Sequence, residues 1–366
     1  MTVLEFQLVN WRNLKPTTIR PNEEMNVFYG DNAQGKTNLL EALWICSGAH
    51  SFRGSKPAEM IGFDQKNTRL SMKFISHGRE QELIYQFGEK KEILLNGVEK
   101  KSPSELFGTV FAVVFAPNHL GLIKDGPAAR RQFIDFALSR LKPTFQNLEE
   151  QYNRALDQRN ALLKTMQLSP NMEPLLDLWE DGLARLGSTY ARQREKYIEK
   201  ILPFAKKFYF ELSGEQEELE LIYDGAGHSS DQGGYEKLLE ELKNSRETDK
   251  KLGYTTVGPH RHDLNVTING ISARTFGSQG QQRSAALALK MAEAEVLSDY
   301  VDEKPIILLD DVMSELDSHR QDYLLNKFSG RQIFITCCDP ASVLRLKEGT
   351  CFYVEQGEIC EKIVTP

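Results

Sequence analysis

The residues with the clearest chemical meaning run from Gly30 to Thr37 and read Gly-Asp-Asn-Ala-Gln-Gly-Lys-Thr. Gly30 and Gly35 allow successive backbone N–H groups to point at phosphate oxygens, and the helix expected from Asn38 adds the positive end of its dipole. Lys36 is expected to reach β- and γ-phosphates, and the Thr37 hydroxyl to hold Mg²⁺. The segment is therefore predicted to be a phosphate-binding loop that binds a nucleoside triphosphate. All of its residues are expected to contact the nucleotide: Gly30, Asp31, Asn32, Ala33, Gln34, Gly35, Lys36 and Thr37.

Two carboxylates, Asp310 and Asp311, follow the apolar run from Pro305 to Leu309. A continuous apolar run ending in acids is typical of a buried parallel strand, whose last residues lie at the edge where ligands bind. Asp310 is expected to bind Mg²⁺, directly or through water. Asp311 is expected to act as the general base that polarises an attacking water. The alternative is an ordinary buried strand followed by a solvated acidic turn, and the phosphate loop earlier in the chain argues against it.

A third segment, from Thr275 to Gln282, precedes a strongly helical stretch at 283–300. Ser278 can cap this helix, and Gly280 lets the backbone approach a bound group, so Ser278, Gly280 and Gln281 are expected to meet a terminal phosphate. The segment resembles the signature motif of ABC-type ATPases, and Ser314-Glu315-Leu316-Asp317 resembles their D-loop. In that superfamily the signature of one subunit completes the ATP site of another. The resemblance therefore implies a homodimer that sandwiches two ATP molecules.

Three positions depart from the usual ABC pattern. Asn118 stands where the Q-loop has Gln, and its shorter amide can still orient water or touch Mg²⁺. Asp311 stands where most ABC heads have Glu, which suggests slow hydrolysis. Thr336, at the end of a strand predicted over 332–336, occupies the position of the switch histidine; it can hydrogen-bond a γ-phosphate but cannot act as a cationic sensor.

Further motifs make the resemblance specific to RecF, a family of bacterial recombination-mediator ATPases. Besides the three segments above, it rests on Asn10-Trp11-Arg12-Asn13-Leu14, Ser51-Phe52-Arg53-Gly54-Ser55-Lys56, Phe115-Ala116-Pro117, the stretch from Pro127 to Asp135, and Gly258-Pro259-His260-Arg261-His262-Asp263. These motifs cover nearly the whole chain, from residue 10 to about residue 339. The resemblance implies that Arg12 and Asn13 also belong to the nucleotide site.

The resemblance also implies a function. We expect a cytoplasmic, ATP-dependent DNA-binding protein of replication and recombinational repair, without membrane association. It would dimerise on ATP, use Mg²⁺, and act as a weak, DNA-stimulated ATPase on double-stranded, single-stranded and gapped DNA. Together with RecO and RecR it would load RecA at gaps and support SOS induction.

These residues need a particular set of elements to position them. Residues 1–125 are predicted to form the N-terminal part of an α/β ATPase lobe, residues 126–212 a helical insertion, and residues 213–366 the C-terminal part of the ATPase lobe. The expected fold class is thus an α/β P-loop NTPase, an ABC-type ATPase head with an inserted helical lobe. Asn96-Gly97 predicts a hairpin. Strands are expected at 4–9, 26–29, 68–75, 82–87, 91–95, 110–115, 219–223, 263–268, 305–309 and 332–336, and helices at 38–45, 129–141, 143–166, 174–212, 235–244 and 281–300.

The composition of the 366 residues, 40% hydrophobic and 27% charged, is that of a soluble globular protein. Neither a signal peptide nor an apolar run of the ~18 residues a membrane helix needs is apparent. The five cysteines lack paired metal-ligand spacing, which fits a reducing cytosol. Net charge is −7, yet residues 126–213 carry 14 Lys/Arg and 11 Asp/Glu, giving 14 − 11 = +3, so the remainder carries −7 − 3 = −10. DNA contact therefore requires a local basic surface.

Candidate DNA contacts are Arg53 and Lys56, in a Gly-Ser loop, and Arg130 and Arg131 at the start of the helical insertion. Further basic residues on the insertion are Arg140, Lys142, Arg192, Arg194, Lys196, Lys206 and Lys207. Such charges along one surface suffice for phosphate contacts, although each pair taken singly is more often a solvated helix face. A metal site at His260 and His262 is less favoured than a packing or hydrogen-bonding role.

Two other functions use part of the same pattern. A metabolite kinase would use the phosphate loop but would have no need of the segment from Ser278 to Gln282. The head of a long-armed chromosome-maintenance protein would need hundreds of heptad residues, and a hinge or Cys-x-x-Cys hook, which this sequence lacks.

Overall fold

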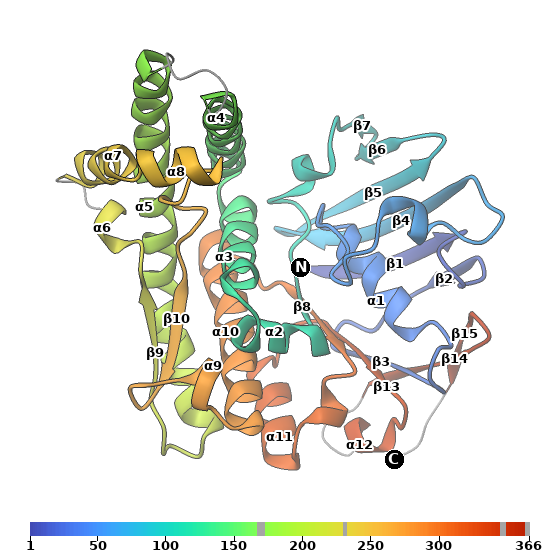
Figure 1. Ribbon diagram of the computed structural model, residues 1–366. Helices are drawn as coiled ribbons and strands as arrows, with labels where there is room; N and C mark the ends of the chain where they lie inside the picture. The colour runs from blue at the N-terminus through green and yellow to red at the C-terminus, as the bar shows by residue number, and fades with distance from the viewer. Residues whose placement is uncertain (167–172, 230–232, 345–348, 363–366) are drawn as a thin grey trace. The chain divides into compact units, whose positions relative to one another are not determined.

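The computed structural model describes residues 1–166, 173–229, 233–344 and 349–362. The chain divides into two compact units, one formed by residues 1–119 with 293–366 and the other by residues 120–292 (Figure 1). Helix α10 (Gln279–Val301) begins in the second unit and ends in the first. The helical segment expected at 126–212 lies within the second unit, and the three-part division predicted from the sequence stays a prediction.

The first unit contains a six-stranded sheet that carries the phosphate loop. Its order is β15-β14-β3-β13-β12-β8, parallel except for the antiparallel edge strand β15. Nearly every residue of the four strands β3, β13, β12 and β8 is buried, which explains their continuous apolar runs. The strands are β3 (Met25–Tyr29), β8 (Ala112–Phe115), β12 (Ile306–Asp310), β13 (Ile333–Cys337), β14 (Thr350–Glu355) and β15 (Glu358–Lys362).

The second sheet of this unit is antiparallel throughout, in the order β2-β1-β4-β5-β6-β7. β4 shows the expected alternation, because Leu70, Met72 and Phe74 are buried between more exposed neighbours. Asn96 and Gly97 have φ of 52° and 76°, which confirms the predicted hairpin turn. The strands are β1 (Thr2–Val9), β2 (Thr17–Ile19), β4 (Asn67–Ser76), β5 (Arg79–Gly88), β6 (Glu92–Leu95) and β7 (Val98–Glu99).

Helix α1 (Lys36–Ile45) follows the phosphate loop and packs on β8, β12 and β13. It is buried along most of its length, so it fixes the loop to the parallel sheet. The remaining helical elements of the first unit are short: α11 (Ser318–Lys327), α12 (Ala341–Leu344) and the 3₁₀ turns η1 (Pro57–Met60), η2 (Pro103–Leu106) and η4 (Met313–Glu315), while η3 (Pro117–Leu120) ends at the unit boundary.

The second unit is built on α5 (Glu173–Leu212), which packs against α3 (Pro127–Leu141), α4 (Pro143–Met166) and the strand β9 (Leu219–Tyr223). A three-stranded sheet, β11-β10-β9, and several short helices complete it (Figure 1). Across the described ranges, no helix is both long and apolar enough to cross a membrane. The other elements are α2 (Gly121–Lys124), α6 (Ala226–Ser229), α7 (Gly234–Asn244), α8 (Arg246–Leu252), α9 (Ala273–Phe276), β10 (Leu264–Ile268) and β11 (Ile271–Ser272).

Comparison with the predicted elements shows where local pattern is sufficient. The predicted strands and helices are confirmed, with boundaries that differ by up to three residues. The largest difference is at β5, which begins at Arg79, three residues before the predicted start. Helix α10 begins at Gln279, two residues early, because Ser278 caps it there. The strands β14 and β15 and the helices α8 and α11 were not predicted.

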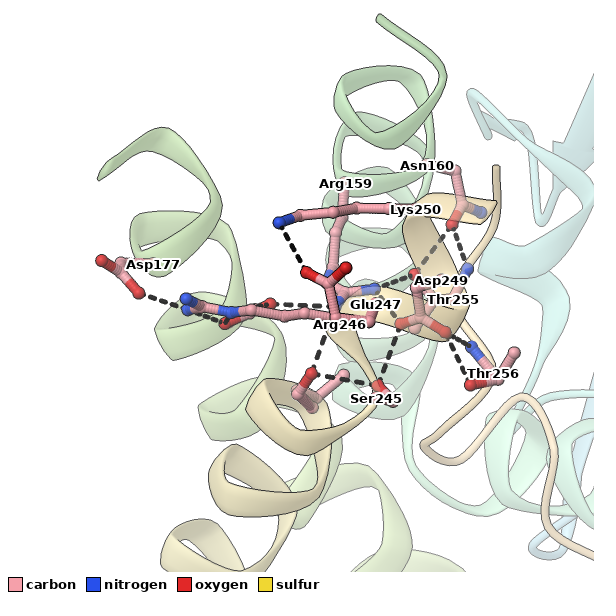
Figure 2. A network of polar contacts seen from close by, with 12 residues as sticks. Arg159, Asn160, Asp177, Ser245, Arg246, Glu247, Asp249, Lys250, Thr255 and Thr256 are labelled. Carbon is pink, nitrogen blue, oxygen red and sulfur yellow. Dashed lines mark hydrogen bonds and ion pairs between the residues drawn. The ribbon is translucent and has the colours of Figure 1, made fainter. Parts of the chain in front are cut away.

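A buried ionic network holds the helices of the second unit together (Figure 2). Arg159 of α4 donates to Glu180 of α5 at 2.9 Å and to Asp249 of α8 at 2.7 Å, and all three side chains are fully buried. Thr255 accepts from Arg159 at 2.9 Å, and Arg246 donates to Glu180 at 2.9 Å. One guanidinium therefore neutralises two buried carboxylates that come from different helices.

Arg159→Met is expected to lower the free energy of unfolding by about 3–5 kcal/mol, because Asp249 would stay buried and lose Arg159, while Glu180 would keep only Arg246. Arg154→Met on the same helix is the control. Its side chain is 79% exposed and its contact with Glu150 is 3.6 Å long, so we expect a change of about 0.5 kcal/mol or less. Urea titration of both variants measures the difference, and equal losses would contradict the role given to Arg159.

Candidate functional site

The phosphate loop adopts a backbone that requires glycine at two positions. Gly30 has φ of 146° and Gly35 has φ of 116°. A Cβ on Gly30 would lie 2.3 Å from the Val354 carbonyl oxygen, and one on Gly35 would lie 2.5 Å from Leu14 Cδ2. Ala33 also has a positive φ of 66°. The loop is therefore held in a curled conformation by close packing, as a cradle of backbone N–H groups for phosphate requires.

Lys36 starts α1 and is only 9% exposed. Its Nζ donates to the carbonyl oxygens of Gly30 at 2.5 Å and Asp31 at 2.7 Å, and it lies 3.9 Å from Cys338 Sγ. The ammonium group is thus folded back over the loop rather than extended into solvent. A cation in this place fits the anionic phosphates that the loop is predicted to bind.

Asp310 is the centre of a second part of the site. Its Oδ1 accepts hydrogen bonds from Thr37 Oγ1 at 2.8 Å and from Thr336 Oγ1 at 2.9 Å. These residues come from α1, β12 and β13, and Asp310 and Thr336 are direct partners in the parallel register. Burial is the main cause that raises the pKa of Asp310. A buried carboxylate beside a threonine hydroxyl is a hard-oxygen ligand set that fits Mg²⁺.

Asp311 has a left-handed backbone, with φ of 52°, directly after β12. Its N–H donates to Thr336 Oγ1 at 2.9 Å, and Ser314 Oγ donates to its carbonyl oxygen at 2.8 Å. Such a conformation is unfavourable for a residue with a Cβ and persists where surrounding contacts hold it. The Thr336 hydroxyl therefore positions both consecutive acids.

Arg12 and Asn13 lie beside the loop and contact residues of α1 and of the segment 51–56. Arg12 forms a bidentate pair with Glu41 of α1, at 2.6 and 2.9 Å, and donates to Ser55 Oγ at 2.7 Å. Asn13 accepts from Asn38 Nδ2 at 2.7 Å. Sequence reasoning missed Glu41, although an acid inside an otherwise apolar helix is a recognisable signal. Direct nucleotide contact by Arg12 and Asn13 stays a prediction.

The loop that contains Arg53 also lies at this site. Arg53 Nη1 donates to Asn38 Oδ1 at 2.7 Å, and Asn118 Nδ2 donates to the Phe52 carbonyl oxygen at 2.6 Å. The positive charge of Arg53 is a minor cause that lowers the pKa of Asp310, opposing the larger effect of burial. Asn118 thus binds the loop in this structure, while Lys56 is exposed. The predicted roles of Asn118, Arg53 and Lys56 stay predictions.

The signature segment, in the second unit, forms a reciprocal cap at the start of α10. Ser278 Oγ accepts from the Gln281 N–H at 3.2 Å, and Gln281 Oε1 accepts from the Ser278 N–H at 2.8 Å. Gln281 Nε2 also donates to Glu217 at 2.6 Å. The predicted helix cap at Ser278 is confirmed, and the side chain of Gln281 takes part in it. A Cβ on Gly280 would lie 4.0 Å from Ser278 Oγ, its nearest neighbour outside the helix backbone. This turn is therefore open to an approaching group.

Arg130 and Arg131 are held inside the second unit. Four of the five N–H groups of Arg130 are engaged: two pair with Asp263 at 2.7 and 2.8 Å, and the others donate to the carbonyls of Leu122 and Asp125. Arg131 donates to the His262 carbonyl at 2.8 Å. Arg130 as a whole is only 4% exposed. This burial disfavours the predicted contact between Arg130 and DNA.

The two histidines of the Gly258–Asp263 segment have hydrogen-bonding roles. His260 contacts Tyr152 OH at 2.7 Å and the Thr255 carbonyl at 3.0 Å, and burial is the main cause that lowers its pKa to about 4. His262 contacts Tyr223 OH at 2.8 Å. Within the ranges that the structure describes, no cluster of three or more His, Cys, Asp or Glu could hold a metal ion.

Three features define an ATPase head of the ABC type: the phosphate loop, the buried strand β12 that ends at Asp310, and the capped turn at Ser278 and Gly280. Residues 2–359 match the family described as the RecF/RecN/SMC N terminal domain. The DNA replication and repair protein RecF of Acetivibrio thermocellus is 38% identical over 345 residues, 93% of this chain and 94% of that protein. RecF of Alkaliphilus oremlandii is 38% identical over 367 residues, 98% of this chain and 100% of that protein. The chain belongs to the RecF family.

Solved structures agree with this assignment. The structure of the recombination mediator protein RecF-ATP in the RecFOR pathway has a TM-score of 0.91 at 37% identity, and covers 99% of this chain and 98% of that chain. The corresponding RecF-ATPrS structure has a TM-score of 0.90 at 38% identity, and covers 98% of this chain and 97% of that chain. An Smc head domain of Pyrococcus furiosus, 14% identical with a TM-score of 0.57, covers 99% of this chain and 96% of that chain, and shows a shared fold alone.

Asp310→Asn keeps an oxygen that can accept from both threonines but removes a buried negative charge. Without nucleotide, we expect this variant to melt about 2 °C or more above the wild type, because a poorly compensated charge is removed. Mg-ATP should raise the melting temperature of the wild type and leave that of Asp310→Asn unchanged.

Asp311→Asn is the matched control, because Asp311 is less buried and its side chain accepts from one serine. Its nucleotide-free melting temperature should stay within about 1 °C of the wild type. Thermal scans with and without Mg-ATP measure all three proteins. A nucleotide-free Asp310→Asn that melts below the wild type would contradict the assignment of Asp310 as a buried charge awaiting a cation.

Proposed function

We propose that this protein is an ATP-controlled DNA-binding ATPase of replication and recombinational repair. Membership of the RecF family supports the biological setting, since its relatives are DNA replication and repair proteins and its structural neighbours are RecF with ATP. The ATPase activity is supported chiefly by the hydrogen bonds from Thr37 and Thr336 to Asp310, which join the phosphate loop to the two acids.

Each residue of the site is given a role in this proposal, which its position supports. The loop N–H groups and Lys36 bind the phosphates, and Thr37 with Asp310 holds Mg²⁺. When bound, Mg²⁺ neutralises charge that develops on the phosphate oxygens. Asp311, fixed by Thr336, accepts a proton from the attacking water. Asp311 is one methylene shorter than glutamate, so we expect slow turnover that DNA stimulates.

The signature turn is proposed to act on a second copy of this chain. Ser278 and Gly280 lie at a capped, open helix start, which suits a terminal phosphate. Each copy would then supply a phosphate loop to one site and a signature turn to the other. ATP would hold the homodimer together, and its hydrolysis would release it, so nucleotide controls when the protein grips DNA.

The finer biology is proposed from the family. Acting in the cytoplasm with RecO and RecR, the protein would mark gapped or junction DNA, promote RecA loading there, and so support SOS induction. The chromosome-maintenance alternative is disfavoured, because α4 ends at Met166 and α5 begins at Glu173, which leaves no room for long arms. The kinase alternative gives no reason for the reciprocal cap at Ser278.

Light scattering with and without Mg-ATP tests the dimer directly. We expect a monomer without nucleotide and a dimer with Mg-ATP. Asp311→Asn should prolong the dimer because hydrolysis is blocked, while Lys36→Ala should stay monomeric because the phosphates are not bound. A monomer under every condition would contradict the shared-site proposal.

Ser278→Arg separates binding from dimerisation. We expect its affinity for Mg-ATP to stay within about twofold of the wild type, since the phosphate loop is intact, while the dimer is lost by a steric and charge effect at the turn. Nucleotide binding can be measured by fluorescence titration of an ATP analogue. Loss of nucleotide binding itself would show that Ser278 acts within its own chain.

A further inference from the structure

The long helix α5 presents a row of lysines that the site above does not use. Lys196, Lys200 and Lys207 are exposed, and on an α-helix these positions fall within about 40° of one another. They extend over about 16 Å along the helix axis. Gln193 and Pro203 lie on the same face, and the exposed Glu199 flanks the row on one side. We call Lys142, Lys196, Lys200 and Lys207 the basic stripe.

Lys142 joins the stripe from the end of α3. Its Nζ donates to Gln193 Oε1 at 2.8 Å, which places it over the same face of α5. The pKa of Lys142 is lowered, first by burial and then by the charges of Lys200 and Lys196. Three ammonium groups are therefore close enough to repel one another. Like charges crowded on one surface are unfavourable for the free protein and become favourable when an anion binds them.

Four other cations of the second unit, three of them buried guanidiniums, are held in ion pairs. Arg130 pairs with Asp263, Arg159 with Glu180 and Asp249, and Arg194 with Asp135, the last at 2.6 Å. Lys206, next to Lys207 in sequence, pairs with Glu220 and points away from the stripe face. These buried guanidiniums thus compensate internal carboxylates, whereas Lys196, Lys200 and Lys207 share one exposed face of α5.

We propose that the basic stripe binds the phosphate backbone of DNA. This inference rests on the proposed function. It assigns the DNA contact to the basic stripe instead of the buried Arg130. A duplex strand carries one phosphate per about 3.4 Å of helix axis, so a row about 16 Å long can meet several phosphates. Lysines act there as point charges without reading bases, so the contact is independent of sequence.

The test is the double variant Lys196→Glu/Lys200→Glu, measured by fluorescence anisotropy on two duplexes of different sequence and on a gapped duplex, with Mg-ATP. We expect affinity to fall tenfold or more on all three DNAs. The slope of log affinity against log salt should fall by about 2, because two phosphate contacts are lost. Lys196→Gln/Lys200→Gln should give a smaller loss in the same direction.

Lys90→Glu/Lys91→Glu is the matched control, since it makes the same change in net charge at two exposed lysines of the β5–β6 turn. Its DNA affinity should stay within about twofold of the wild type. Mg-ATP binding and dimer formation should be unchanged in every variant, which separates the stripe from the nucleotide site. Wild-type affinity in Lys196→Glu/Lys200→Glu, or an equal loss in the control, would overturn the stripe while leaving the proposed function standing. A wild type that binds ATP but no DNA would overturn both.

Discussion

A carboxylate shared by two threonine hydroxyls joins the parts of the nucleotide site. Asp310 ends a fully buried strand, and its Oδ1 accepts from Thr37 on one side and from Thr336 on the other. Burying a charge is unfavourable unless a cation or hydrogen bonds compensate it. The two hydroxyl groups compensate the charge of Asp310 only in part, because burial still raises its pKa, and a bound cation would supply the rest. The parallel order of the sheet creates the arrangement, because the ends of β3, β12 and β13 meet at one edge. The same Thr336 hydroxyl also holds the Asp311 N–H, so the geometry of the metal ligand and that of the general base depend on each other.

The second unit uses its charges in two separate ways. Guanidiniums such as Arg159 and Arg194 are buried and bridge helices through carboxylates, which makes them part of the scaffold. The lysines Lys196, Lys200 and Lys207 remain exposed on one face of α5. The difference follows from chemistry. The planar guanidinium group of arginine can donate two hydrogen bonds to one buried carboxylate, whereas the ammonium group of lysine is flexible and strongly hydrated. Counting basic residues in the sequence therefore overstates how many can meet DNA, and the structure is needed to tell the two groups apart.

Local pattern predicted most of the fold and the chemical centre of the site. The phosphate loop, the buried strand before Asp310 and the cap at Ser278 each depend on neighbours within a few residues, so their sequence is informative by itself. The pairing of Arg12 with Glu41 and the burial of Arg130 against Asp263 depend on contacts between distant segments, and the sequence does not reveal them. The strands β14 and β15 were missed for the same reason: β14 pairs with β3 from the other end of the chain, and β15 pairs with β14 as the edge strand of the sheet.

The central claim is that a triphosphate held by one chain contacts the signature turn of another. A photoreactive ATP analogue with its label on the γ-phosphate tests this in a mixture of tagged wild type and untagged Lys36→Ala, which cannot hold the analogue alone. Mass spectrometry then identifies the labelled peptide and its chain of origin. We predict label on the Lys36→Ala chain, in the peptide that contains Ser278 and Gly280, and none on that chain when the wild type is absent. Label confined to the wild-type chain at every mixing ratio would contradict the shared site.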